Sequence, residues 1–466
     1  MININTAKTR EANKLFWISP ETKEKKHFKV IEKTYQNNTD SDYTEKIEDL
    51  ARNFNYSSNS KQYWGAVEFS TLYGTPLFEE ASHSEKRALN HLYWVGMYNY
   101  TSASEVNTML FNEITAGVFA NIGGYETLCN ELDFENSQET YHIRAFQRIG
   151  YKTKLALLGK SALGNPFQKL TSKNRLGWLS RVETKSLEKL LETEKLSTFQ
   201  DSTIRNISKF LYSDHDKYLS QYFRKRRNQT LPTTTGGVAG TAWLPSFLKF
   251  FTFSWGCSPF LAAQYYSARM IANIYLKGYE YNYHKRFREL GKQEKPIPTP
   301  TAISYYHLLD ESFHTTMSQV ISQEVYKDFA KPTTAEKIIA NWIIYSAQRG
   351  LLEGLSAAMP STFRDDSSYM LTTYRLLRSP LFNMSAHESL HWMEKCFCQE
   401  HEGFHTNLKH HKRLLSDFRR FFEKLDYLLP VNREMHLMAA GGSISRAIQK
   451  NRKDFKKFSM SIELSR

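Results

Sequence analysis

The sequence is poor in cysteine. Its 466 residues contain only Cys129, Cys257, Cys396 and Cys398, and their spacing forms neither a CxxC pair nor a regular ladder. A disulfide framework is therefore excluded, and the simplest interpretation is a reduced, cytoplasmic protein.

A long, uninterrupted apolar run is also absent. The mean hydropathy is −0.55, which excludes a polytopic membrane protein. The first residues, MININTAKTREANKLFW, contain no apolar core of the kind that a signal peptide requires. The most apolar stretch, 243–276, is interrupted by prolines and by basic and amide side chains. We expect this stretch to form buried helices and predict no membrane span.

Valine and alternating strand patterns are scarce, and no internal repeat is found, so the chain is expected to be mostly α-helical. Hydrophobic residues make up 41% of the chain, which is enough to bury a large core. We expect a polar, loosely packed N-terminal arm at 1–60, a helical bundle at 61–330 with an inserted helical segment at about 152–240, and C-terminal helices at 331–466 that pack on the bundle.

Four long helical patterns dominate the bundle region. The first begins with Ser84 as the N-cap and ends at the Gly123–Gly124 pair. The other three cover about 125–151, 259–290 and 302–329, with a proline-rich linker at 295–301. Further helices are expected at 334–357, 386–398, 404–427 and 441–457, together with an amphipathic segment at 186–196 and a loop at 232–240.

One stretch combines three side chains that commonly bind metals, His307, Glu311 and His314. On an α-helix, positions i, i+4 and i+7 lie within about 60° of one another, so the three side chains form one stripe. Two imidazoles and a carboxylate on one stripe make a ready set of metal ligands. The inner pair, Glu311 and His314, is a Glu-x-x-His motif.

A second Glu-x-x-His motif, Glu139 and His142, lies in the second long helix. Two such helices, together with one glutamate from each of two further helices, build the di-iron carboxylate bundle. Carboxylates and imidazoles suit iron or manganese, and a bridging carboxylate can hold two such ions close together. We therefore predict an all-α fold with a ferritin-like di-metal four-helix bundle as its core, elaborated with additional helices.

Each single glutamate should precede its Glu-x-x-His partner by one helical hairpin. Glu280 fits the second hairpin, because the proline-rich linker lies between it and Glu311. Glu105 and Glu113 both fit the first hairpin. We favour Glu105, because the midpoint between it and Glu139 falls beside the Gly-Gly turn.

These residues carry a resemblance to the p-aminobenzoate N-oxygenase family of di-iron enzymes. That family has an extra histidine one turn before its last Glu-x-x-His, which is the position of His307 in HxxxExxH at 307–314. The resemblance covers roughly 84–150 and 258–330. It implies a ligand set of Glu105, Glu139, His142, Glu280, His307, Glu311 and His314.

The length and the Phe- and Tyr-rich composition are more similar to a divergent branch, the dimetal-carboxylate halogenases of cyanobacterial pathways such as cylindrocyclophane biosynthesis. This resemblance implies chlorination of an unactivated carbon in a fatty acyl chain held on an acidic acyl carrier protein. It also implies two iron ions with manganese as the alternative metal, O2 and chloride as co-substrates, and an external electron donor. N-oxygenation of an arylamine, hydroxylation of an acyl chain and non-catalytic metal binding remain open alternatives.

Three further residues adjoin the ligands on the fourth helix. Tyr305 and Tyr306 are candidate catalytic residues, as redox tyrosines or hydrogen-bond donors to the metal site, with simple packing as the alternative. Asp310 is a candidate hydrogen-bond partner for a histidine ligand. It points about 100° away from Glu311 on a helix, so an exposed position or a contact with another helix is the alternative.

Two His-Glu-x-x-His strings, at 387–391 and 401–405, suggest a rival function as a zinc peptidase. In such enzymes the two histidines bind zinc and the glutamate, here Glu388 or Glu402, acts as a base. The neighbouring basic run 409–413 and the helix-weakening Gly403 favour histidines at the surface or between helices instead.

The formal net charge of +14 calls for an acidic partner. Basic residues cluster at 224–227, 409–413 and 450–457, but no nucleic-acid-binding module accompanies them, so we expect no nucleic acid as partner. The family resemblance makes a carrier protein the expected partner, with Arg224, Arg226 and Arg227 as a candidate docking site and solvated faces as the alternative.

Overall fold

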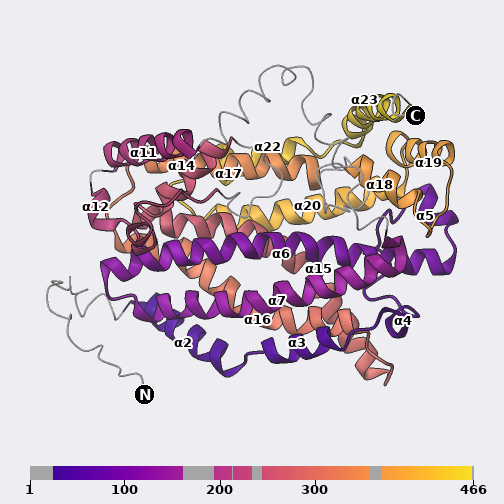
Figure 1. Cartoon of the computed structure of the whole chain (residues 1–466), viewed down its shortest axis with the longest axis horizontal. Helices are drawn as coiled ribbons and strands as arrows, with labels where there is room; N and C mark the ends of the chain where they lie inside the picture. Colours follow the sequence, from indigo (N-terminus) through magenta and orange to yellow (C-terminus); the bar gives the residue numbers. More distant parts are fainter. Residues whose placement is uncertain (1–24, 161–193, 213, 234–243, 356–368, 464–466) are drawn as a thin grey trace.

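The structure, a computed structural model, describes residues 25–160, 194–212, 214–233, 244–355 and 369–463. Every regular element within these ranges is a helix, which confirms the predicted all-α class (Figure 1). The N-terminal segment considered as a signal peptide lies outside the described residues, as do most of the amphipathic segment at 186–196 and of the loop at 232–240.

Four long helices form the core as two antiparallel hairpins. The first hairpin consists of α6 (His83–Ile122) and α7 (Glu126–Leu158), and the second of α15 (Pro259–Lys292) and α16 (Thr299–Gln323). Helix α15 packs against α6, and α16 packs against α7, which closes the bundle. Figure 1 shows α6, α7 and α16 running side by side along the long axis of the molecule.

The two ends of the first hairpin explain the length of α6. Its N-cap is Ser82 and not Ser84 as expected, because Ser82 and Glu85 form a reciprocal capping box. Its C-terminal end is set by Gly123 and Gly124, which have φ values of 82° and 83°. This left-handed conformation is strained for residues with a side chain, so the pair ends the helix and reverses the chain.

The described part of the N-terminal segment, residues 25–60, packs against the bundle, whereas the polar composition of 1–60 predicted a loose arm. Within it, α2 (Lys26–Asp40), α3 (Thr44–Arg52) and α4 (Tyr56–Asn59) lie against the bundle, and α2 and α3 contact both α7 and α16. The reason is a narrow apolar stripe at helical spacing, Ile47, Ala51 and Phe54, which is fully buried.

The remaining helices cover the bundle at its sides and ends. Helices α17 and α20 pack on α15, whereas α18, α19 and α23 form a separate apolar cluster near α5. The bounds are α5 (Pro76–Glu80), α11 (Glu194–Leu211), α12 (His215–Tyr218), α13 (Gln221–Lys225), α14 (Pro245–Trp255), the 3-10 helix η1 (Val325–Asp328), α17 (Thr334–Leu355), α18 (Tyr369–Leu377), α19 (Ala386–Cys398), α20 (Glu402–Phe422), α21 (Pro430–Arg433), α22 (His436–Ala440) and α23 (Ile444–Glu463).

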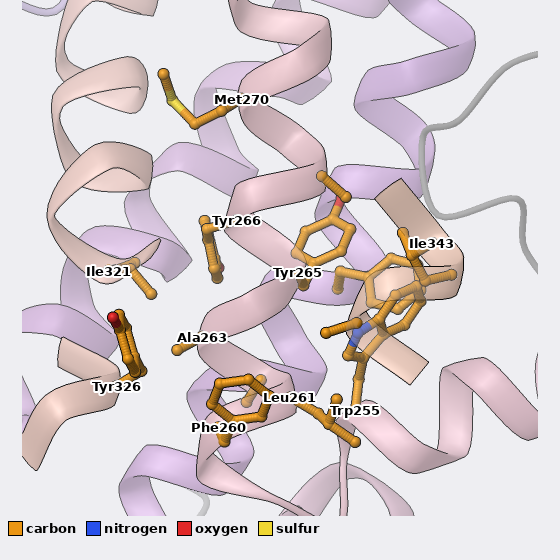
Figure 2. Close-up of a cluster of buried hydrophobic side chains, with 14 of the residues drawn as sticks. Trp255, Phe260, Leu261, Ala263, Tyr265, Tyr266, Met270, Ile321, Tyr326 and Ile343 are labelled. Atoms are coloured by element: carbon orange, nitrogen blue, oxygen red, sulfur yellow. The ribbon is translucent and has the colours of Figure 1, made fainter. Parts of the chain in front are cut away.

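The largest apolar cluster surrounds the first half of α15. Phe260, Leu261 and Tyr265 are buried there with Trp255 of α14 and Ile343 of α17, as Figure 2 shows. Because neighbouring helices cover this half of α15 on every side, its sequence can be apolar all round without facing lipid. No helix in the described ranges is both long and apolar enough to cross a membrane.

Candidate metal centre

The four long helices bring together all seven side chains that the sequence motifs suggest as metal ligands. Every one of them is buried. The cluster, called the metal centre below, consists of Glu105 from α6, Glu139 and His142 from α7, Glu280 from α15, and His307, Glu311 and His314 from α16. The alternative first ligand, Glu113, is exposed on the outside of α6.

Six of the seven side chains fall into two groups whose donor atoms converge. Ligand atoms of Glu105, His142, His307 and Glu311 lie within 4.8 Å of one another. A second group with the same spread contains Glu139, Glu311 and His314. Glu311 belongs to both groups and offers a donor atom to each.

The two Glu-x-x-His histidines are oriented in the same way. Nε2 of His142 lies 3.1 Å from Oδ2 of Asp310, and Nε2 of His314 lies 2.9 Å from Oε1 of Gln138. Each Nε2 therefore donates its proton to a fixed acceptor, so Nδ1, which faces the carboxylates, is the nitrogen that would give up its proton to a metal. Asp310 is fully buried in this position and contacts a histidine ligand, one of the two arrangements considered from the sequence.

His307 and Glu280 form the remaining corner of the centre. Nδ1 of His307 lies 2.6 Å from Oε1 of Glu280, and its Nε2 lies 3.1 Å from Oε1 of Glu105. The hydroxyl of Tyr98 donates to the same Oε1 of Glu280 at 2.7 Å. Glu280 thus stands beside the two converging groups and is joined to them by His307.

The buried carboxylates contain oxygens that are left without a partner. Oε2 of Glu105 and Oε2 of Glu280 have no hydrogen-bond partner within the described part of the chain. Burial, with the charge of Glu139 as the next cause, raises the pKa of Glu105 to about 7. Unpartnered carboxylate oxygens are costly to bury unless a cation neutralises them. The donor set and its free oxygens therefore fit a bound metal.

Arg269 is a buried part of the site that sequence reasoning missed. Its Nη1 donates to Oε2 of Glu135 at 2.6 Å, and its Nη2 donates to Oε1 of Glu139 at 3.4 Å. Burial alone would lower the pKa of Arg269, but the two carboxylates outweigh burial and raise it. A signal was present in the sequence, because Arg269 is the only charged residue in the apolar stretch 260–276.

The two candidate catalytic tyrosines are not brought to the metal centre. Tyr305 stacks on Phe287 at 4.0 Å between ring centroids, and Tyr306 packs against Tyr43 at 5.3 Å. Both are half-buried among these rings. Tyr98 does touch a ligand residue, Glu280. It lies seven residues before Glu105 on the same helix, so this spacing was a signal in the sequence that our prediction did not use.

The two His-Glu-x-x-His strings have other partners. Glu388 accepts the backbone N–H of Ser385 in a capping box, and His387 and His391 are exposed. His401 is the N-cap of α20, and His405 is exposed beside Glu400. Neither string contributes to a converging group of metal ligands among the residues that the structure describes.

A cavity between α6 and α15 reaches the metal centre. Three of the candidate ligands, Glu105, Glu139 and Glu311, line it from the inside. Thr101, Tyr275 and Tyr279 are among its other walls. The cavity therefore brings three ligand carboxylates to the wall of a space between the helices.

The comparison with known protein families gives a match over nearly the whole chain. Residues 26–459 match the family model described as acyl halogenase, CylC-like. No curated protein and no solved structure gives a significant match. The matched region contains both hairpins and all seven residues of the metal centre, in agreement with the resemblance inferred from the ligand motifs. The chain belongs to the CylC-like family of acyl halogenases.

Proposed function

We propose that this protein uses a dinuclear iron centre and O2 to chlorinate an unactivated carbon of a fatty acyl chain carried on an acyl carrier protein. The observation that carries this proposal is the buried set of four glutamates and three histidines from four helices. Two divalent ions would balance the four negative charges of Glu105, Glu139, Glu280 and Glu311. Carboxylate and imidazole donors favour iron or manganese over softer metals.

In the proposed enzyme, the three histidines and four glutamates would hold the two ions, and Glu311 belongs to both groups of donor atoms. The chemistry that bound iron would supply is its reaction with O2. This reaction would break a strong C–H bond and transfer the halide to the carbon. Asp310 and Gln138 would keep the protons of His142 and His314 on Nε2, so that both Nδ1 atoms stay available.

Aromatic rings around His307 support an oxidising role. The ring of Phe146 lies 4.8 Å from the ring of His307, and Tyr98 lies 6.0 Å from it. Trp94 packs in turn on Tyr98 at 4.4 Å. These rings exclude water from one side of the centre, which protects a reactive site from side reactions.

The experiment that tests this function measures the mass of the product. The protein is loaded with iron and supplied with O2, chloride, an electron donor and a decanoyl thioester of an acyl carrier protein. We expect the acyl chain to gain chlorine and lose hydrogen, and Glu139→Ala to abolish the change. An unaltered acyl chain, together with oxidation of an arylamine supplied in a parallel reaction, would overturn the proposal in favour of N-oxygenation. A gain of oxygen would indicate hydroxylation, and metal uptake with no product would indicate a non-catalytic bundle.

A further inference from the structure

A second cavity lies between α15 and α20, outside the one that reaches the metal centre. Its 810 Å³ of space between side chains includes solvent at the open mouth. Its apolar and aromatic lining comes from α6, α15, α20 and the segment before α5: Phe69, Tyr73, Tyr93, Tyr275, Tyr279 and Leu414.

Two tyrosines are shared by both cavities. Tyr275 and Tyr279 line the outer cavity on one side and the inner cavity with Glu105 on the other. The hydroxyl of Tyr279 is hydrogen-bonded to that of Thr101, so this ring is fixed. Tyr275 is only half-buried, and its hydroxyl lies 3.8 Å from Sδ of Met97. The two rings therefore form the partition between the outer cavity and the metal centre.

We propose that the outer cavity is the entrance through which a carrier-bound acyl chain reaches the metal centre, and that the basic face of α20 binds the acidic carrier. This inference rests on the proposed function. The chain passes between α15 and α20 and continues past Tyr275 and Tyr279 into the inner cavity.

The lining of the entrance suits an acyl chain. Aromatic rings and Leu414 provide the apolar surface that an alkyl tail needs for binding. Gly278 is part of the lining, and a Cβ at this position would already touch Cδ2 of Leu414 at 3.9 Å, so the atoms of a longer side chain would occupy the cavity. Polar residues of the lining, including His410 and Arg413, are half-buried or exposed, which places the polar part of the substrate at the mouth.

The exposed face of α20 beside this mouth is rich in positive charge. Its basic residues, all exposed, are Lys409, Lys412, Arg413, Arg419 and Arg420. They recur at helical spacing, so they point to the same side of α20. A basic helix face next to the entrance is complementary to an acidic carrier and would steer its approach.

The basic cluster at 224–227 stands far from this entrance. Arg224 donates to Oδ1 of Asn121 near the C-terminal end of α6, whereas Tyr93, near the other end, lines the entrance. The helical stretch between Tyr93 and Asn121 is about 40 Å long. Figure 1 accordingly shows α12, which directly precedes α13, at one end of the molecule and α5 at the other. The geometry thus favours α20 over 224–227 as the docking surface.

A matched pair of glycine variants tests the entrance. Gly278→Leu fills the cavity, whereas Gly291→Leu adds the same side chain to the same helix where a Cβ meets nothing within 4 Å. We expect Gly278→Leu to lower turnover of a decanoyl carrier thioester about tenfold or more, with unchanged iron content, and Gly291→Leu to match wild type. Gly278→Ala should give an intermediate loss. Wild-type turnover by Gly278→Leu would contradict the assignment of the outer cavity as the entrance.

A matched pair of charge reversals tests the docking surface. We expect Lys412→Glu with Arg413→Glu to weaken carrier binding about tenfold at low salt, with a smaller effect at high salt. The control, Arg226→Glu with Arg227→Glu, should bind as wild type. A loss confined to the control would move the docking site to 224–227 and overturn the assignment to α20.

Photo-crosslinking separates a failure of this inference from a failure of the proposed function. A pantetheine thioester whose acyl chain ends in a diazirine is irradiated with the iron-loaded protein. Crosslinks to Tyr275, Tyr279 or Leu414 without chlorinated product would leave the entrance intact and overturn the halogenase assignment. Crosslinks to other residues, with chlorination retained, would contradict the assignment of the outer cavity as the entrance. The proposed function would be unaffected.

Discussion

The imidazole of His307 on α16 joins the two helices of the second hairpin through a short contact with Glu280 on α15, in which Nδ1 lies 2.6 Å from Oε1. The hydroxyl of Tyr98 donates to the same oxygen. Because both bonds fall on Oε1, Oε2 of Glu280 is left without a partner in the described part of the chain. Glu280 can therefore orient His307 and bind a metal at the same time.

Replacing this carboxylate by an amide separates its two roles. In Glu280→Gln the amide oxygen can still accept from His307 and Tyr98, but the amide nitrogen cannot bind a cation. We expect the variant to retain about one iron ion per chain instead of two, as measured by metal analysis of the purified protein.

Tyr98→Phe is the matched control, because it removes one hydrogen bond to Glu280 and leaves the carboxylate. It should retain both ions. Full iron content in Glu280→Gln would show that Glu280 only orients His307.

The pairing of Arg269 with Glu135 and Glu139 leads to a prediction about stability. All three side chains are almost fully buried, so removing the guanidinium leaves two carboxylates without their cation. We expect Arg269→Met to lower the free energy of unfolding of the metal-free protein by about 3–5 kcal/mol. Urea denaturation followed by circular dichroism measures this loss.

A second substitution shows that the loss comes from charge and not from packing. Glu135→Gln added to Arg269→Met removes one of the stranded charges and should recover part of the lost free energy. Equal stability of the single and double variants would contradict the electrostatic explanation.

The ligand set was predictable because it depends on local geometry. His307, Glu311 and His314 share a helix face whatever the helix packs against, and Glu139 with His142 repeats the pattern. Arg269 was not predictable in the same way. Its partner Glu135 is distant in the sequence, and their contact depends on how α15 packs against the other hairpin.

Short motifs were a weaker guide where a residue has several uses. Glu388 belongs to a zinc-peptidase string, yet its carboxylate caps α19 together with Ser385. The Ser-x-x-Glu spacing that forms this cap was also present in the sequence. Likewise, the N-terminal segment appeared polar, but Ile47, Ala51 and Phe54 are buried and pack α3 and the residues after it on the bundle.

Metal uptake should become tighter as the pH rises. Burial raises the pKa of Glu105 to about 7. Burial alone would lower the pKa of His142, but Asp310 and Glu139 raise it to about 9. Glu311 and Glu135 likewise overcome burial and raise the pKa of His314 to about 10. A metal must displace the protons that these groups hold near neutral pH.

These raised pKa values also determine how the metal-free protein responds to pH. The bound protons stabilise the folded state below the ordinary pKa values of these groups, and this stability is lost as the pH rises through the raised values. Each displaced proton changes the free energy of metal binding by about 1.4 kcal/mol per pH unit. We therefore expect the difference in melting temperature between iron-loaded and metal-free protein to widen from pH 6 to pH 8. A constant difference over this range would contradict the prediction.

Metal analysis of two single variants distinguishes the bundle from the rival zinc site. Glu139 lies within the converging ligands, whereas His387 is exposed on the first turn of α19. We expect Glu139→Ala to lose most of its iron and all halogenation. His387→Ala should keep the wild-type iron content and the wild-type turnover, because this side chain touches no part of the metal centre.

If the protein instead carries one zinc ion that disappears in His387→Ala and persists in Glu139→Ala, the peptidase motif is the functional site. Both variants are compared at equal protein concentration after the same metal loading, so that differences in iron content report on the ligands alone.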